Sequence, residues 1–120
     1  MSADTRWGAY VEQRLTELER GDGDFTGLQH PTATTVQHAR RVAAETFRDT
    51  TPTPSVVPTE EGDVAFAWHK NGMDAEIEVS ETGAEFWVHD RVTGEVDSGP
   101  LTDREGVAWL LDRIADGKAA

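Results

Sequence analysis

The fold of this chain is decided by residues 63–79, which read DVAFAWHKNGMDAEIEV. On both sides of its centre, apolar residues alternate with small or polar ones: Val64, Phe66 and Trp68 come first, then Met73, Ala75, Ile77 and Val79. A two-residue period is typical of a strand with one buried and one solvated face. Asn71-Gly72, between the two runs, favours the positive φ angles of a type I′ turn. The stretch therefore predicts an antiparallel hairpin.

The segments that flank this hairpin extend the predicted sheet and delimit it. Alternating residues predict a third strand over 84–91, and a short fourth strand is expected over 95–98. The sheet region is then 63–99, a four-stranded antiparallel meander. Residues 51–62 contain three prolines, which fix φ and remove backbone donors. We expect this segment to be an extended connector that separates the sheet from the residues before it.

Helical periodicity appears before and after the sheet. Apolar residues at three- and four-residue spacing predict two helices within residues 2–50 and a C-terminal helix over 102–116. Thr32 is expected to cap the second helix. Thr102 and Glu105 have the S/T-x-x-E spacing of a capping box, so the third helix is expected to begin there.

Together these elements predict one α+β domain over residues 1–120, with the order ααββββα. Each helix has one apolar stripe, and each full-length strand has one apolar face. We therefore expect the helices to pack on one face of the sheet and to leave the other face open.

Composition excludes several classes of protein. The chain has no cysteine, which rules out disulfides, thiolate nucleophiles and Cys-ligated zinc. No apolar run approaches the roughly 20 residues that span a bilayer. The first residues lack the basic region and apolar core of a secretory signal. We expect a cytoplasmic protein.

The charge is strongly and unevenly negative. The chain has 23 acidic and 11 basic residues, a formal charge of -12, and residues 60–97 hold 11 acidic residues against Lys70 and Arg91. Such a surface repels phosphate backbones and anionic lipids, so no direct binding to nucleic acid or membrane is expected. The acidity either keeps the protein in solution or provides a docking surface for a basic protein.

Strand alternation places the candidate binding residues. If Phe86 faces the helices, the open face carries a large aromatic side chain among acidic ones, and aromatic anchors are common at binding hot spots. The candidate partner-binding residues are Trp87, Glu76, Glu78, Glu85 and His89. The alternation leaves a second register open, in which Trp87 is buried and Phe86 faces out.

Two histidines are candidate metal ligands. His69 and His89 fall on the same predicted face, near carboxylates that also bind zinc or iron. No H-x-E-H or H-E-x-x-H motif supports such a site, and surface histidines are the simpler interpretation. His30 and His38 show no spacing of a catalytic triad, and the Asp22/Asp24 pair lacks the remaining residues of a calcium loop.

One resemblance covers about a quarter of the chain. Its residues are Pro54, Val56 and Pro58, then Glu61-Gly62, Val64-x-Phe66-x-Trp68 and Ala75-x-Ile77-x-Val79, all within 52–83. This pattern resembles a group of small uncharacterised bacterial proteins, in which a helix and a proline-rich connector precede an acidic-Gly turn and a β-hairpin whose first strand ends in Trp. The resemblance implies a fold and no activity, so it assigns no catalytic residue.

Three functions are consistent with these features. The first is a non-enzymatic acidic interaction module that binds a basic protein, such as an antitoxin, an immunity protein or a phage-type inhibitor. The second is a small metal-dependent enzyme or metal-binding domain that uses His69 and His89. The third is a homo-oligomer, for example a homodimer, that pairs through the open face or the edge strand at residues 95–98. No cofactor is expected for the first.

Overall fold

The computed structural model describes residues 7–21 and 30–115. They form three helices and a five-stranded sheet: α1 (Gly8–Arg20), α2 (Ala33–Thr46), β1 (Ser55–Pro58), β2 (Val64–Lys70), β3 (Met73–Val79), β4 (Ala84–Asp90), β5 (Val96–Pro100) and α3 (Arg104–Ile114). The predicted α+β class and antiparallel sheet are confirmed. The predicted four strands are wrong, because the described part of the chain contains five.

The fifth strand lies in the segment predicted to be a connector. β1 pairs with β2 in antiparallel register, with Val56 opposite Phe66. Val56 is almost completely buried, so the strand contributes to the core. Proline is tolerated at a sheet edge, where an outward N–H is not needed, and Pro58 ends this short strand. The predicted connector over residues 51–62 is therefore wrong for residues 55–58, which form β1, and is limited to the residues on either side of this strand.

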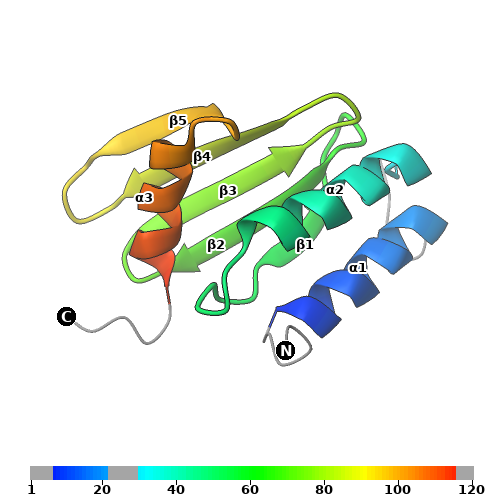
Figure 1. The fold of residues 1–120 in the computed structure, drawn as a ribbon, viewed down its shortest axis with the longest axis horizontal. Coiled ribbons are helices and arrows are strands. Elements are labelled where there is room, and N and C mark those ends of the chain that lie inside the picture. The colour runs from blue at the N-terminus through cyan, green and yellow to red at the C-terminus, as the bar shows by residue number, and fades with distance from the viewer. Residues whose placement is uncertain (1–6, 22–29, 116–120) are drawn as a thin grey trace.

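The sheet is a simple meander with the strand order β1-β2-β3-β4-β5 (Figure 1). Asn71 and Gly72 have φ angles of 56° and 76°, as a type I′ turn requires, and Lys70 lies opposite Met73. The predicted β2–β3 hairpin is thus confirmed. β5 extends to Pro100, two residues beyond the predicted strand.

All three helices lie on one face of the sheet (Figure 1). A cross-strand row of Val56, Phe66, Ile77 and Phe86 lies beneath them, and these side chains are almost fully buried. The helices contribute apolar side chains to the same cluster, including Leu15, Leu18, Val36, Leu110 and Ile114. The core therefore lies between one sheet face and one helical layer.

The helix starts differ in one case from the prediction. Thr32 caps α2 by accepting a hydrogen bond from the backbone N–H of Thr35 at 3.2 Å, as expected. The capping box at Thr102 is wrong: Asp103 is the N-cap of α3 and accepts from the N–H of Gly106 at 3.1 Å. Gly106 packs against the Phe86 ring, and a Cβ at this position would lie 2.4 Å from Phe86 Cζ. The first turn of α3 can approach the ring this closely because residue 106 is glycine.

Several expectations fall on residues outside the described ranges. These are the start of the first helix before Trp7, the loop around Asp22 and Asp24, and the chain after Ala115. Among the described helices, none combines the length and the apolar content that crossing a membrane requires.

Candidate functional site

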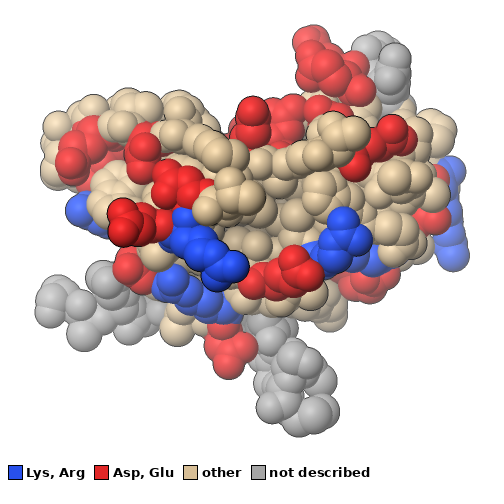
Figure 2. Space-filling model, turned by 45° about the horizontal axis from the view of Figure 1, so that its top comes forward, with Lys and Arg blue, Asp and Glu red and all other residues tan. Residues whose placement is uncertain are grey.

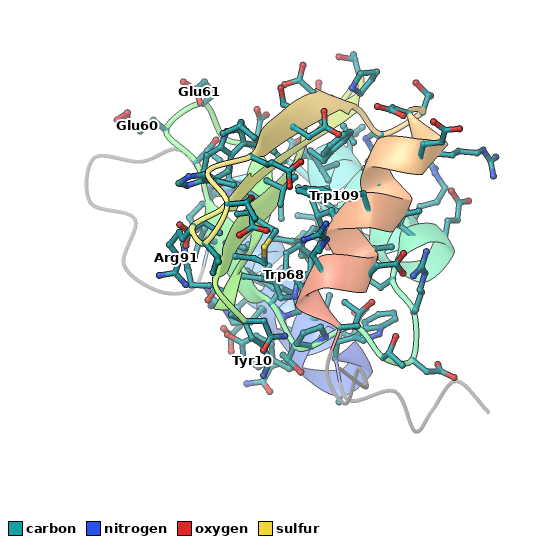
Figure 3. The ribbon with its side chains drawn as sticks, turned by 90° about the vertical axis from the view of Figure 1, so that its left-hand side faces the viewer. Tyr10, Glu60, Glu61, Trp68, Arg91 and Trp109 are labelled. Carbon is teal, nitrogen blue, oxygen red and sulfur yellow. The ribbon has the colours of Figure 1, made fainter. Side chains whose placement is uncertain are left out.

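The face of the sheet opposite the helices is the candidate functional site. Seen from the side, the helices lie to the right of the sheet, and the side chain of Arg91 extends to the left, away from them (Figure 3). We call this side the open face. Its outward residues are Ser55, Val57, Ala65, Ala67, His69, Asp74, Glu76, Glu78, Glu85, Trp87, His89, Val96, Ser98 and Pro100.

Strand alternation sets which aromatic residue of β4 faces out. Phe86 is 2% exposed and lies beneath the helices, whereas Trp87 is 43% exposed on the open face. The register that buries Trp87 is therefore wrong. The other three tryptophans of the chain are buried or half-buried, so Trp87 is the most exposed of the four.

Three glutamates surround Trp87 on two adjacent strands. Glu76 lies directly across from Trp87, and Glu78 lies directly across from Glu85. Like charges opposite each other in a sheet destabilise it, because side chains at such positions are close. Within the described residues, none of these three carboxylates forms an ion pair with Lys, Arg or His.

The same residues line an open recess of about 350 Å³. Its walls are Glu76, Glu78, Glu85 and Trp87, with Ser98 and Pro100 from β5 and parts of Phe86 and Gly99 at its base. Burial raises the pKa of Glu78 above that of an ordinary glutamate; a hydrogen bond with the Asp63 side chain raises it further, as do the charges of Asp63, Glu76 and Glu61. The recess therefore has a negative potential that a cation would relieve.

A second polar row crosses the open face at the other end of these strands. Asp74 lies between His69 and His89 in register. His69 Nδ1 donates to Asp74 Oδ1 at 2.7 Å, while His89 Nδ1 lies 4.0 Å and Arg91 Nε 3.6 Å from Asp74 Oδ2. The hydrogen bond from His69 lowers the pKa of Asp74, and the charges of Arg91 and the histidines lower it further. Asp74 therefore lies at the centre of this row, close to three basic side chains.

In the described residues, the group of side chains close enough together to bind a metal ion does not include the two histidines. Glu61, Asp63 and Glu78 have ligand atoms within 4.8 Å of one another, and no such group contains His69 and His89. The two histidines thus share a face and a carboxylate neighbour, but their ring nitrogens do not converge on one point. Exposed carboxylates such as Glu61 are common on surfaces without a metal.

The outer edge of β1 is poorly suited to pairing with another strand. Thr59 N–H donates to Asp63 O within the β1–β2 hairpin, so the backbone groups of Pro54, Val56 and Pro58 point away from β2. Both prolines lack an N–H. The Val56 carbonyl accepts from Arg14 Nη2 at 3.0 Å and Nε at 3.3 Å, so α1 covers this edge.

β5 forms the other edge, and its donors are also reduced. Leu101 N–H donates to Ala84 O, so by alternation the backbone groups of Val96, Ser98 and Pro100 point outward. Ser98 N–H donates to Asp97 Oδ1 at 2.9 Å, and proline has no N–H to donate. Strand addition at either edge is therefore disfavoured.

A larger groove, of about 650 Å³, lies on the helical side between α2 and α3. Its apolar floor includes Val42 and Leu111, and its rim holds Arg48, Arg104 and Glu45. Arg48 is already paired with Asp112 at 2.7 Å. The mixed charges of this rim select no class of ligand.

Sequence reasoning placed the five partner-binding candidates on one face, but it missed three features of the surface. These are Asp74 between the two histidines, the opposition of Glu78 and Glu85, and the contact from Arg14 to β1. The first two depend on strand register, and the third depends on how α1 packs. A scan of protein-family models and searches of curated proteins and of solved structures found no match to this chain.

Proposed function

We propose that this chain is a non-enzymatic interaction module whose open face binds a basic protein, in the manner of an antitoxin, an immunity protein or a phage-type inhibitor. The observation that carries the proposal is the exposed Trp87 among Glu76, Glu78 and Glu85, none of which has a cationic partner in the described residues. A solvated surface needs no large aromatic side chain at its centre. A binding surface uses it as an anchor.

The separation of charge supports this proposal. Seven of the described basic residues lie on the helices or directly after α2: Arg14, Arg20, Arg40, Arg41, Arg48, Arg104 and Arg113. Figure 2 shows blue side chains on the helical side of the molecule. The open face is left with carboxylates and, at its far end, Arg91. A basic partner is therefore attracted to the open face and less to the helical side.

Site-specific photo-crosslinking in the native host tests the proposal. A photoreactive amino acid at Ser98 lies beside Trp87, and the same amino acid at Gln37 on α2 is the matched control on the helical side. We expect one basic protein to be crosslinked at position 98 and not at position 37. Recovery of the same proteins at both positions, of acidic proteins only, or of none would contradict the proposal.

A second candidate function is divalent-metal binding by His69 and His89, as a binding domain or a small metal-dependent enzyme. The observation that favours it is their shared row with Asp74, whose carboxylate accepts a hydrogen bond from Nδ1 of His69 and so leaves Nε2 as the ring nitrogen that could bind a metal. Calorimetric titration of the untagged protein with zinc tests it. Stoichiometric binding that is lost in His69→Ala/His89→Ala supports this function, and heat that persists in that variant contradicts it.

A further inference from the structure

We propose that the recess beside Trp87 binds the guanidinium group of one arginine side chain of the partner, stacked on the indole and held by the carboxylates of Glu78 and Glu85. This inference rests on the proposed function and names the chemistry of its central contact. It concerns one side chain of the partner, within the larger contact of two surfaces.

The first argument is the unbalanced charge of the recess. Several carboxylates of the described residues are paired with an arginine: Glu17 with Arg14, Glu12 and Glu19 with Arg40, Asp112 with Arg48 and Asp90 with Arg113. Glu78 and Glu85 face each other without such a partner in the described residues. Because Glu76, Glu78 and Glu85 line the same recess, a cation bound there offsets part of their combined negative charge.

The second argument is the combination of an indole with carboxylates. A planar guanidinium stacks on tryptophan and can donate hydrogen bonds to two carboxylate oxygens at once. A lysine ammonium is a more strongly hydrated point charge and matches this geometry less well. The recess therefore favours arginine over lysine.

A comparable arrangement exists within the described part of this fold. Arg113 lies over the ring of Trp109, with Cζ 4.7 Å from the ring centroid, and its Nη1 is 3.2 Å from Asp90 Oδ2. One arginine thus contacts a tryptophan and a carboxylate together. At Trp87 the aromatic ring and the carboxylates are present, and the partner would supply the arginine.

The recess opens on the side of the sheet away from the helices. Its volume of about 350 Å³ suits one long side chain rather than an element of secondary structure. Because the outward donors of β1 and β5 are few, a partner strand gains little by pairing at an edge. The partner is instead expected to lie across the open face, with the arginine side chain directed down into the recess.

The test uses three short peptides on the unmutated chain: Ac-Gly-Ser-Arg-Ser-Gly-NH₂ and its lysine and citrulline counterparts. Citrulline keeps the shape of arginine and lacks its charge. The indole N–H signals of the tryptophans are followed by NMR, and Trp87→Phe identifies the signal of Trp87. We expect the arginine peptide to shift this signal with saturation. The citrulline peptide is expected to bind at least roughly tenfold more weakly, because one charge-assisted hydrogen bond contributes about that factor to affinity.

Variants locate the site. Glu78→Gln/Glu85→Gln is expected to abolish the difference between the arginine and citrulline peptides. Glu45→Gln, an exposed residue of α2, is the control and is expected to keep it. Equal binding of the two peptides to the unmutated chain, or a shift of another indole signal only, overturns the proposal whether or not the double variant folds.

The two proposals fail in distinguishable ways. If Ser98 crosslinks a basic protein but the arginine and citrulline peptides bind alike, docking on the open face stands and the arginine site is wrong. If the arginine peptide is selected but position 98 captures no basic protein, the recess binds guanidinium and the proposed function is wrong.

Discussion

Trp68 and Trp87 lie on opposite faces of the sheet and have opposite environments. Trp68, labelled in Figure 3, is 3% exposed. It donates its indole N–H to the Pro52 carbonyl at 2.7 Å and packs edge-on against Phe47. Trp87 has its indole toward solvent beside three carboxylates. The first is a core residue, and the second occupies a position where folding does not require a large apolar side chain.

Replacement of each tryptophan by alanine separates the two roles. Trp68→Ala is expected to lower the free energy of unfolding by about 3 to 5 kcal/mol, because it removes a large buried ring and leaves a cavity. Trp87→Ala is expected to change it little, since the ring is already largely hydrated. Urea unfolding followed by circular dichroism measures both. Equal losses in the two variants would contradict the assignment of the faces.

The raised pKa of Glu78 predicts how stability depends on pH. Because burial and nearby carboxylates raise this pKa in the folded state, the stability that protonated Glu78 contributes is present below the unfolded pKa of about 4.3 and is lost as pH rises through the folded pKa. Glu78→Gln removes this loss. We expect the variant to gain stability relative to the unmutated chain as pH rises from 4 to about 7.

Unfolding free energies of both proteins across this pH range give the difference directly. Glu45→Gln serves as the control, because Glu45 is exposed and makes no ion pair within the described residues. A constant difference between Glu78→Gln and the unmutated chain from pH 4 to 7 would show that Glu78 titrates like an ordinary surface glutamate.

Among the elements, the edge strand β1 was not predicted from the sequence pattern. Three prolines near β1 indicate a connector when they are considered by spacing alone, because proline is rare inside sheets. In the structure Pro58 ends the edge strand β1 and Pro54 directly precedes it, and their missing N–H groups matter least there because neither is needed for pairing with β2. Whether such a segment is an edge strand or a connector depends on whether it pairs with β2, and spacing alone does not show that pairing. For this reason the fifth strand was not predictable.

A strand edge with restored donors tests the role of β5. In Asp97→Ala/Pro100→Thr, the N–H groups at positions 98 and 100 both become available outward. We expect this variant to self-associate with increasing concentration, because unpaired edge groups are a template for another chain. Sedimentation velocity measures the association. Glu45→Ala loses one acidic charge and frees no donor, so an equal rise in that control would attribute the effect to charge.

The site was predictable to the extent that it depends on local geometry. Alternation in residues 63–79 and 84–91 correctly puts Glu76, Glu78 and His69 on one face, and the two-residue turn at Asn71-Gly72 fixes the β2–β3 register. The β3–β4 connection spans residues 80–83, a length that allows more than one register. The opposition of Glu78 to Glu85 follows from the register observed there, so it required the structure.

At the scale of the whole molecule, the charge of -12 is not spread evenly over the surface. Three arginines of the helical side, Arg14, Arg40 and Arg48, are paired with acidic residues of the helices, as Arg40 is with Glu12. The open face keeps carboxylates without cationic partners around Trp87. The molecule therefore presents two sides of different charge, and long-range attraction orients a basic partner before contact.

This asymmetry predicts how association with the basic protein crosslinked at position 98 responds to salt. The on-rate is expected to fall as ionic strength rises, because the screening length shortens to roughly 8 Å at physiological salt. The off-rate is expected to change less. Glu76→Gln/Glu78→Gln removes two charges from the open face and should lower the on-rate and flatten its salt dependence, with the circular dichroism spectrum unchanged.

Trp87→Ala should mainly raise the off-rate, because it removes a desolvated anchor and leaves the long-range field intact. Stopped-flow measurements at several salt concentrations separate the two rates, and Glu45→Gln measures the effect of one charge lost from the helical side. An on-rate that responds neither to salt nor to the two substitutions on β3 would mean that the acidic residues of the open face serve solvation alone.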